Sequence, residues 1–136
     1  MGVLTYLQPV HGAKPAGEEV DIDTSWFDLT EGLSALGLDG EFIVTGNIFV
    51  ATGDEDSDSV GVYEGRLDPE EVQGNWQQLQ TVTFERYWAA YRETPHGKGC
   101  NHPDHDEYLK AHFTILKDVY QRAADAGAGM KFMAWH

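Results

Sequence analysis

The chain has 136 residues, a formal net charge of −14 at pH 7 and an aromatic content of 12%. This length suits a single domain, residues 1–136, with a hydrophobic core of its own, and the aromatic residues argue against a chain that is disordered throughout. No apolar run approaches the roughly 20 residues that cross a bilayer, so we expect no membrane association. The first residues also lack the basic flank and apolar stretch of a signal peptide.

Cysteine usage and charge indicate the compartment and the class of partner. Cys100 is the single cysteine, which excludes an internal disulfide and favours a reducing cytoplasm. Residues 1–65 hold one base, Lys14, against thirteen acids, whereas residues 66–136 hold eight bases and ten acids. An acidic surface repels a phosphate backbone, so we expect no nucleic-acid partner. It suits a protein partner with a basic surface, although a need for solubility explains the same charge.

The first third of the chain predicts a strand, a loop and a helix, in that order. Residues 3–7 have the alternation of a strand, and residues 8–20 contain the prolines and glycines of a loop. Asp23 or Thr24 can cap a helix that ends at Gly37. The apolar side chains of this helix recur on one side and are Trp26, Leu29, Leu33 and Leu36.

The middle of the sequence predicts a β-hairpin and one further strand. Residues 41–52 form two β-branched and aromatic runs on either side of Gly46-Asn47. Glycine at the first central position of a two-residue loop suits a type II′ turn. Residues 53–59 are polar and acidic and predict a loop, and residues 60–63 predict a short strand.

Two helices and an irregular loop are predicted next. Asp68, Pro69 and Glu71 have the order of a capped helix start, and Thr83 can cap a second helix. The buried side chains expected for the two helices are Val72, Trp76 and Leu79, then Phe84, Tyr87, Trp88 and Tyr91. Residues 94–103 predict an irregular loop that contains histidine and glycine.

The last third of the chain carries the longest helical pattern. Asp104 and Glu107 have the spacing of a capping box, and Gly127 is placed to close the helix in a left-handed conformation. Leu116 is at the centre of the apolar stripe, and residues 130–135 predict a terminal strand. Together these elements predict an α+β fold, a small antiparallel sheet with helices packed against it.

Several of these stretches resemble the YfbM-like family of uncharacterised bacterial proteins. They are residues 21–26, residues 63–72 with Leu67-Asp68-Pro69-Glu70-Glu71-Val72, residues 83–85, and residues 108–127 with the terminal strand. The chain departs from the family in residues 1–20, which are short for the family's N-terminal helical segment, and in a compressed segment before the last helix. The resemblance implies an α+β fold. It implies no activity, because the family has no established catalytic residues.

A histidine-rich segment offers metal or nucleophile chemistry. His96, Cys100, His102 and His105 are of the residue types that Zn²⁺ prefers, and a flexible loop can bring four ligands into a tetrahedron. Their spacing matches no paired zinc motif, and a polar surface loop with incidental histidines explains it more simply. Cys100 could also be a nucleophile with His96 or His105 as its base. We therefore expect no cofactor, with zinc at these four residues as the alternative.

The acidic residues of the middle loop offer a possible calcium site. Asp54, Asp56 and Asp58 alternate along the chain as in the opening of a calcium-binding loop, but position 6 is Ser59 and position 12 is Gly65. The motif requires glycine and glutamate at those two positions. A solvated acidic loop is the better interpretation.

A second kind of site is suggested by basic and aromatic side chains of one predicted helix. Trp88 and Tyr91 could stack on a flat, nucleotide-like ligand, and Arg86 and Arg92 could neutralise its charge. The helical spacing of the aromatic residues equally makes them part of the core.

Non-enzymatic binding is the function that the sequence favours. We expect an acidic protein of the inhibitor or immunity type that engages a basic-surfaced partner. The acidic face would consist of Glu18, Glu19, Asp21, Asp23, Asp54, Glu55, Asp56 and Asp58. The alternative is a small-molecule binding protein that uses the aromatic and arginine residues, and the third hypothesis is a metal- or cysteine-dependent enzyme. The identity of the partner and the oligomeric state are left open.

Overall fold

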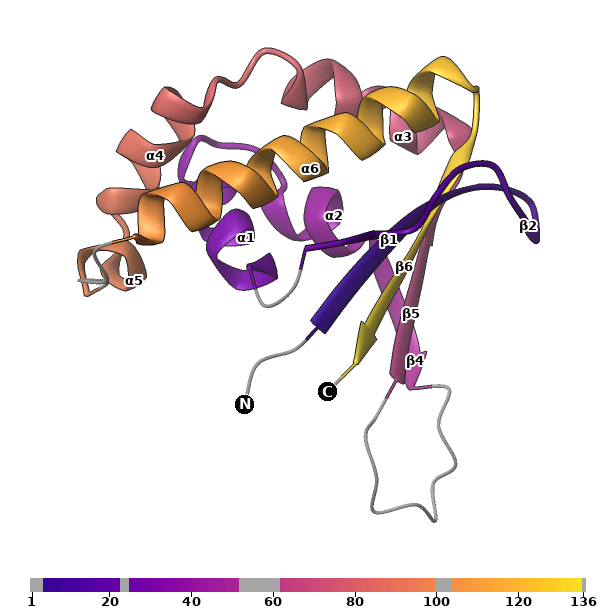
Figure 1. Cartoon of the computed structure of the whole chain (residues 1–136), viewed down its shortest axis with the longest axis horizontal. Coiled ribbons are helices and arrows are strands. Elements are labelled where there is room, and N and C mark those ends of the chain that lie inside the picture. Colours follow the sequence, from indigo (N-terminus) through magenta and orange to yellow (C-terminus); the bar gives the residue numbers. More distant parts are fainter. Residues whose placement is uncertain (1–3, 23–24, 52–61, 100–103, 136) are drawn as a thin grey trace.

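The computed structural model describes residues 4–22, 25–51, 62–99 and 104–135. Over these residues the chain forms an antiparallel sheet of six strands and a layer of six helices, part of which packs against the sheet (Figure 1). The predicted α+β class and antiparallel sheet are therefore confirmed. No helix among the described residues is long and apolar enough to cross a membrane.

The terminal strand lies inside the sheet. The strands are β1 (Leu4–His11), β2 (Lys14–Pro15), β3 (Val20–Asp21), β4 (Asn47–Ala51), β5 (Val62–Leu67) and β6 (Gly129–Trp135). Their order is β2-β1-β6-β5-β4, and β3 also pairs with β1. β6 pairs with β1 from Leu4↔Trp135 to Val10↔Gly129, and its other edge pairs with β5. The two ends of the described chain are therefore joined at the centre of the sheet.

The predicted boundary of the first strand was wrong. β1 continues past residue 7 to His11, and the segment predicted as a loop contains β2 and β3. The pairing with β6 explains the difference, because Gln8, Pro9 and Val10 lie opposite residues of that strand. Strand formation depends on such cross-strand partners more than on local preference. The predicted loop is correct for the tight connection to β2, where Gly12 has a φ of +62°, and for residues 16–19 between β2 and β3.

The predicted hairpin at residues 41–52 was also wrong in its first half. Residues 41–45 belong to helix α2 (Gly40–Thr45), which follows helix α1 (Trp26–Ala35) and packs against it. The Asp39 side chain accepts a hydrogen bond from the Phe42 N–H and caps α2. Gly46, with a φ of +64°, ends this helix instead of forming a hairpin turn. A short apolar run is compatible with either a buried strand or a buried helix, and burial against α1 selects the helix here.

The other helices follow in chain order and are α3 (Pro69–Leu79), α4 (Phe84–Arg92), α5 (Pro95–Lys98) and α6 (His105–Asp125). The predicted caps of α3 and α4 are confirmed: Asp68 and Glu71 form a capping box, and Thr83 accepts from the Arg86 N–H. The first part of the predicted irregular loop is instead the short helix α5, capped by Thr94.

Two other predicted caps differ. The candidates for α1, Asp23 and Thr24, lie outside the described residues, and Ser25 is at the N-cap position without a side-chain capping bond. Asp104 is at the N-cap of α6, but its side chain makes no capping hydrogen bond, so the predicted capping box is absent there. At the other end of α6, Gly127 has the predicted left-handed conformation, with a φ of +63°.

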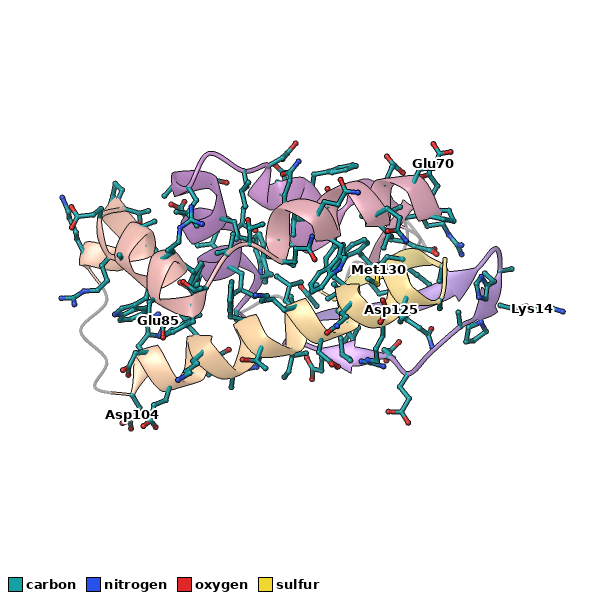
Figure 2. All side chains as sticks on the ribbon, turned by 90° about the horizontal axis from the view of Figure 1, so that it is seen from above. Lys14, Glu70, Glu85, Asp104, Asp125 and Met130 are labelled. Carbon is teal, nitrogen blue, oxygen red and sulfur yellow. The ribbon has the colours of Figure 1, made fainter. Side chains whose placement is uncertain are left out.

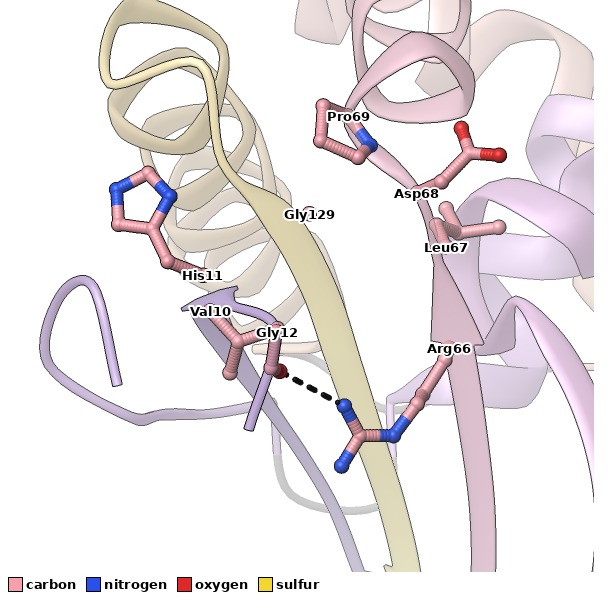
Figure 3. Close-up of a pocket in the computed structure, with 8 residues that line it drawn as sticks. All are labelled: Val10, His11, Gly12, Arg66, Leu67, Asp68, Pro69 and Gly129. Atoms are coloured by element: carbon pink, nitrogen blue, oxygen red, sulfur yellow. Dashed lines mark hydrogen bonds between the residues drawn. The ribbon is translucent and has the colours of Figure 1, made fainter. Parts of the chain in front are cut away.

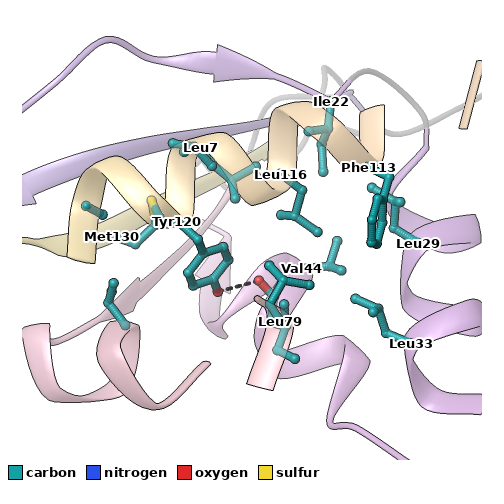
Figure 4. Close-up of a cluster of buried hydrophobic side chains, with 14 of the residues drawn as sticks. Leu7, Ile22, Leu29, Leu33, Val44, Leu79, Phe113, Leu116, Tyr120 and Met130 are labelled. Atoms are coloured by element: carbon teal, nitrogen blue, oxygen red, sulfur yellow. Dashed lines mark hydrogen bonds between the residues drawn. The ribbon is translucent and has the colours of Figure 1, made fainter. Parts of the chain in front are cut away.

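Helix α6 runs along the whole length of the helical layer, from Asp104 to Asp125 (Figure 2). Its inner side forms the core with residues of the sheet and of α1 to α4, as Figure 4 shows for Leu116, Leu7 and Leu29. Leu116 is 0% exposed, as the predicted stripe requires. The chain reverses direction at Gly127 and continues into β6. Helix α6 therefore lies against the same sheet in which β6 is a central strand.

Two core tyrosines connect separate elements through their hydroxyl groups. The hydroxyl group of Tyr120, on α6, donates to the Ile43 carbonyl, and Figure 4 draws this hydrogen bond as a dashed line. The same hydroxyl accepts from the Asn75 amide. Tyr87 of α4 donates to the Asp28 carbonyl. Burial is the main cause that raises the pKa of both phenols far above the ordinary value of 10.0.

We expect the Leu116→Ala substitution to lower the free energy of unfolding by about 2–5 kcal/mol, because it leaves a cavity among fully buried side chains. Urea denaturation followed by circular dichroism measures this loss. Ile115→Ala is the matched control, since Ile115 is on the same turn and only partly buried, and its loss should be clearly smaller. A loss below about 1 kcal/mol for Leu116→Ala would contradict the assignment of this helix side to the core.

We expect Tyr87 and Tyr120 to stay protonated at pH values where ordinary tyrosines ionise. Because their pKa is raised in the folded state, their contribution to stability is complete below pH 10.0, the ordinary value, and is lost as the pH rises above it. Tyrosinate absorbance during an alkaline titration should therefore leave at least these two residues unionised until unfolding. In Tyr120→Phe the number of residues that stay unionised should fall by one. Ionisation of all tyrosines before any loss of circular dichroism would contradict this.

Candidate functional site

A buried carboxylate lies where four helices meet at one end of the helical layer. Asp28 of α1 is 8% exposed, and its Oδ1 accepts a hydrogen bond of 2.7 Å from the Tyr91 hydroxyl of α4. The Nε2 of His96, on α5, lies 2.7 Å from the same oxygen. The Nε2 of His105, the first residue of α6, lies 3.1 Å from the Tyr91 oxygen and 4.0 Å from Oδ1. We call Asp28, Tyr91, His96 and His105 the Asp28 cluster.

The local sequence explains how His96 reaches this carboxylate. Thr94 and Pro95 begin α5 directly after α4, with the Thr94 hydroxyl accepting from the Gly97 N–H. Gly97 packs against the backbone of Tyr91 so closely that a Cβ atom would overlap the Tyr91 carbonyl oxygen. The short helix is therefore folded back onto α4, which directs the His96 side chain toward α1.

The Asp28 cluster has one open side. The His96 side chain is 44% exposed, whereas that of Asp28 is 12% exposed and that of His105 is 14% exposed. Phe27, which is 40% exposed, contacts the edge of the His96 ring with 4.9 Å between the ring centres. The imidazole of His96 thus separates the buried carboxylate from water and is itself accessible to solvent.

This arrangement can hold an imidazole in one orientation. A carboxylate that pairs with one ring nitrogen fixes the orientation of the ring, as in sites of general acid–base chemistry. The carboxylate also needs these partners, because a buried charge without hydrogen bonds or a counter-charge is strongly destabilising. The Asp28 cluster therefore both joins the four helices and presents a solvent-accessible proton donor or acceptor.

The metal hypothesis concerns two residues of this cluster. The structure brings His96 and His105 together, but around Asp28. Cys100 and His102 lie outside the described residues. Among the residues that the structure does describe, no group of three or more histidine, cysteine, aspartate or glutamate side chains is arranged to hold a metal ion. Zinc at the four predicted ligands remains a hypothesis.

The predicted aromatic and arginine residues are only partly brought together. Arg92 lies over the Trp88 ring, 6.0 Å from its centre, and Tyr91 is buried next to them with its hydroxyl in the Asp28 cluster. The Arg86 Nη1 instead donates to the Thr81 carbonyl before α4, at 3.2 Å.

The predicted acidic face is described only in part. Glu18, Glu19 and Asp21 are exposed, on the segment that leads into β3 and on β3 itself. Asp23, Asp54, Glu55, Asp56 and Asp58 lie outside the described residues, so their positions relative to these three stay a prediction.

Asp28 is the functional candidate that the sequence analysis missed. It lies next to the apolar stripe of α1, and Gly32 follows it by one helical turn at a point where the Tyr87 ring leaves no room for a Cβ atom. The sequence did contain one indication of this site, because Asp28 and Gly32 are one helical turn apart and next to the predicted apolar stripe. A search for apolar periodicity does not register it, because neither residue is a large hydrophobe.

Two surface hollows lie away from the Asp28 cluster. The first, of about 400 Å³, lies between the turn after β1, the end of β5 and the start of α3, and Arg66 is at its edge (Figure 3). The second, of about 600 Å³, lies between α3, α4 and α6, where Trp76, Phe84 and Phe113 contribute aromatic walls. Lys117 at this second hollow donates to the Val82 carbonyl at 2.8 Å.

Comparisons with known proteins give a likeness in fold. No protein-family model matches the chain, and a search of curated proteins finds no match. The chain is similar in structure to YfbM from Escherichia coli, a protein of unknown function, with a TM-score of 0.60 and 14% sequence identity. The likeness covers 96% of this chain and 99% of that one. The chain therefore has a YfbM-like fold over almost its whole length.

We expect the Asp28→Asn substitution to lower the free energy of unfolding by about 1–3 kcal/mol, because the buried carboxylate loses its charge-assisted contacts with Tyr91 and His96. Asp118→Asn is the matched control, since the Asp118 side chain is 61% exposed and pairs only with Arg122 on the same helix. It should cost less than about 0.5 kcal/mol. Chemical denaturation measures both, and equal effects would contradict the role of the Asp28 cluster in joining the helices.

Proposed function

We propose that the protein is a non-enzymatic binding protein that engages a macromolecular partner with a basic surface, in the manner of an inhibitor or immunity protein. The observation that carries this proposal is the excess of surface acid. The chain has 23 acidic residues against nine lysines and arginines. Within the described residues, Glu64 and Asp118 are paired with arginine at the surface, and most other acidic side chains are exposed.

The segment before and within β3 is the part of the proposed acidic face that the structure describes. The Gln8 side chain donates to the Gly17 carbonyl at 3.1 Å, and β3 pairs with β1, so this segment is held against the sheet. Glu18, Glu19 and Asp21 are exposed along it. A backbone that is already held in place loses less conformational freedom on binding than a free chain does, which supports this segment as a contact surface.

Charge of this kind acts mainly before contact. A negative field attracts a positively charged cleft over several ångströms, raises the association rate and disfavours phosphate-rich competitors. The single cysteine is compatible with action in the cytoplasm, which we include in the proposal.

The two alternative functions have less support from the described residues. For a nucleotide-like ligand, Tyr91 is buried with its hydroxyl in the Asp28 cluster, so it does not join Trp88 and Arg92 in one exposed surface. For an enzyme, the Asp28–His96 pair supplies an oriented imidazole, and Cys100 lies outside the described residues. Substitutions at these residues therefore belong in the experiment below.

We expect neutralisation of Glu18, Glu19 and Asp21 to glutamine and asparagine to slow association with the partner. The partner is first isolated from host lysate, and rates are then measured at two salt concentrations. The Debye length is about 8 Å at physiological ionic strength, so the difference from the native protein should shrink at high salt. Neutralising Asp54, Glu55, Asp56 and Asp58 should have the same effect.

The matched control removes the same charge elsewhere. Glu85, Glu93 and Asp104 are also exposed and lie on or next to α4 and α6. Neutralising these three residues should slow association less, since it makes the chain less negative by the same amount but leaves the proposed acidic face unchanged. Equal effects of the two triple variants would contradict the location of the face. Rates independent of salt, or a loss of binding on Trp88→Ala or Arg86→Ala, would contradict the proposed function.

A further inference from the structure

The hollow near Arg66 has the size and walls of a small-ligand site. Its volume of about 400 Å³ is within the range of about 300–1,000 Å³ usual for such sites. Val10, Leu67 and Pro69 contribute apolar walls, and Figure 3 shows His11 and Arg66 at two sides of the same hollow. These residues come from β1, β5 and the first position of α3, so three packed elements hold the walls in place.

Arg66 is positioned across the hollow by a long-range contact. Its Nη1 donates to the Gly12 carbonyl at 3.0 Å, which joins the end of β5 to the turn after β1 (Figure 3). Its Nη2 lies 3.2 Å from Glu64 Oε1 on the same strand. The side chain is 48% exposed. A guanidinium has five N–H donors in one plane, so two such contacts orient it and leave donors for a ligand.

Other polar side chains lie on the neighbouring strands. His11 is exposed at the end of β1 and pairs in register with Lys14 of β2. Lys131 of β6 is directly opposite Arg66 of β5, so the two are on the same face of the sheet. The strand register thus places one further basic residue, Lys131, beside Arg66.

The acidic residue at the hollow is already engaged. Asp68 accepts from the Glu71 N–H at 2.8 Å in the capping box, and Figure 3 shows its carboxylate turned away from Arg66. The capping box also occupies a backbone N–H group at the N-terminal end of α3, so this helix end is not part of the proposed ligand site. Recognition of a charged ligand therefore depends on Arg66, whose guanidinium also contacts Glu64.

We infer that this hollow binds a small organic carboxylate, whose apolar body lies against Val10, Leu67 and Pro69 and whose carboxylate meets Arg66. The planar fork of arginine matches the two oxygens of a carboxylate. A single negative charge suits a protein of net charge −14 better than a doubly charged phosphate does. The site is separate from the acidic face proposed above and does not depend on it.

The test is a titration of the full ¹⁵N-labelled chain, followed by amide chemical shifts. The probes are benzoate and hexanoate, the neutral analogue benzamide, and inorganic phosphate. We expect benzoate and hexanoate to shift the amides of Gly12, Leu67 and Gly129 in a saturable way. Benzamide should produce no saturable shift, because it lacks the charge that Arg66 recognises. Phosphate should bind more weakly than either carboxylate.

The Arg66→Gln substitution should weaken carboxylate binding by about tenfold or more, as expected for the loss of a charge-assisted pair. Arg86→Gln is the matched control, because Arg86 is also exposed and donates through Nη1 to a backbone carbonyl. It should leave the affinity unchanged. An unchanged pattern of the remaining amide signals in Arg66→Gln establishes that its fold is intact, and Arg66→Lys provides a second variant that keeps the charge but loses the fork.

Several results would overturn the inference. They are equal shifts with benzamide and benzoate, tighter binding of phosphate than of both carboxylates, equal weakening by Arg66→Gln and Arg86→Gln, or no saturable shift at these amides with either carboxylate. Intermediate affinity in Arg66→Lys would support the role of the planar fork.

Discussion

The pairing of β6 with β1 is the constraint on which the rest of the structure depends. β6 is flanked on both sides, by β1 and β5, so its backbone groups are satisfied within the sheet. Because Gly127 reverses the chain just before β6, α6 must lie along the sheet on the side where its apolar stripe is buried. The remaining helices then pack against α6 and the covered face. Leu116 and Tyr120 are fully buried because they lie on the side of α6 that faces the sheet and the other helices.

The far end of the helical layer combines apolar packing with one buried charge. Asp28 is a buried acid, and its oxygen is satisfied by side chains from α4 and α5, with the start of α6 close by. Such a group specifies an arrangement, since a shift of any partner would leave the charge unpaired. The cost of burying the carboxylate is thus offset by contacts that also place His96 at the surface. The Asp28 cluster therefore holds the helices together and also exposes the imidazole of His96 to solvent.

The two binding surfaces that we propose rely on electrostatics at different distances. The acidic residues near β3 act through a field that salt screens, and their effect is on the approach of a macromolecule. Arg66 acts at contact distance, within a hollow whose walls come from three elements. In a chain with net charge −14, an exposed arginine such as Arg66 is one of few basic groups that an anionic ligand can meet. The likeness to YfbM concerns the shared fold and leaves both surfaces as properties to be tested on this chain.

The sequence by itself determined those features that depend only on residues a few positions apart. The caps at Asp68 and Thr83, the left-handed Gly127 and the stripe of α6 were predicted because a cap or a helical turn involves residues only a few positions apart. The tertiary structure decided the rest. Residues 41–45 became a helix through burial against α1, and β1 extended to His11 through β6. The Asp28 cluster and the contact of Arg66 with Gly12 join residues far apart in sequence, and no local pattern specifies such meetings, because they exist only once the elements have packed.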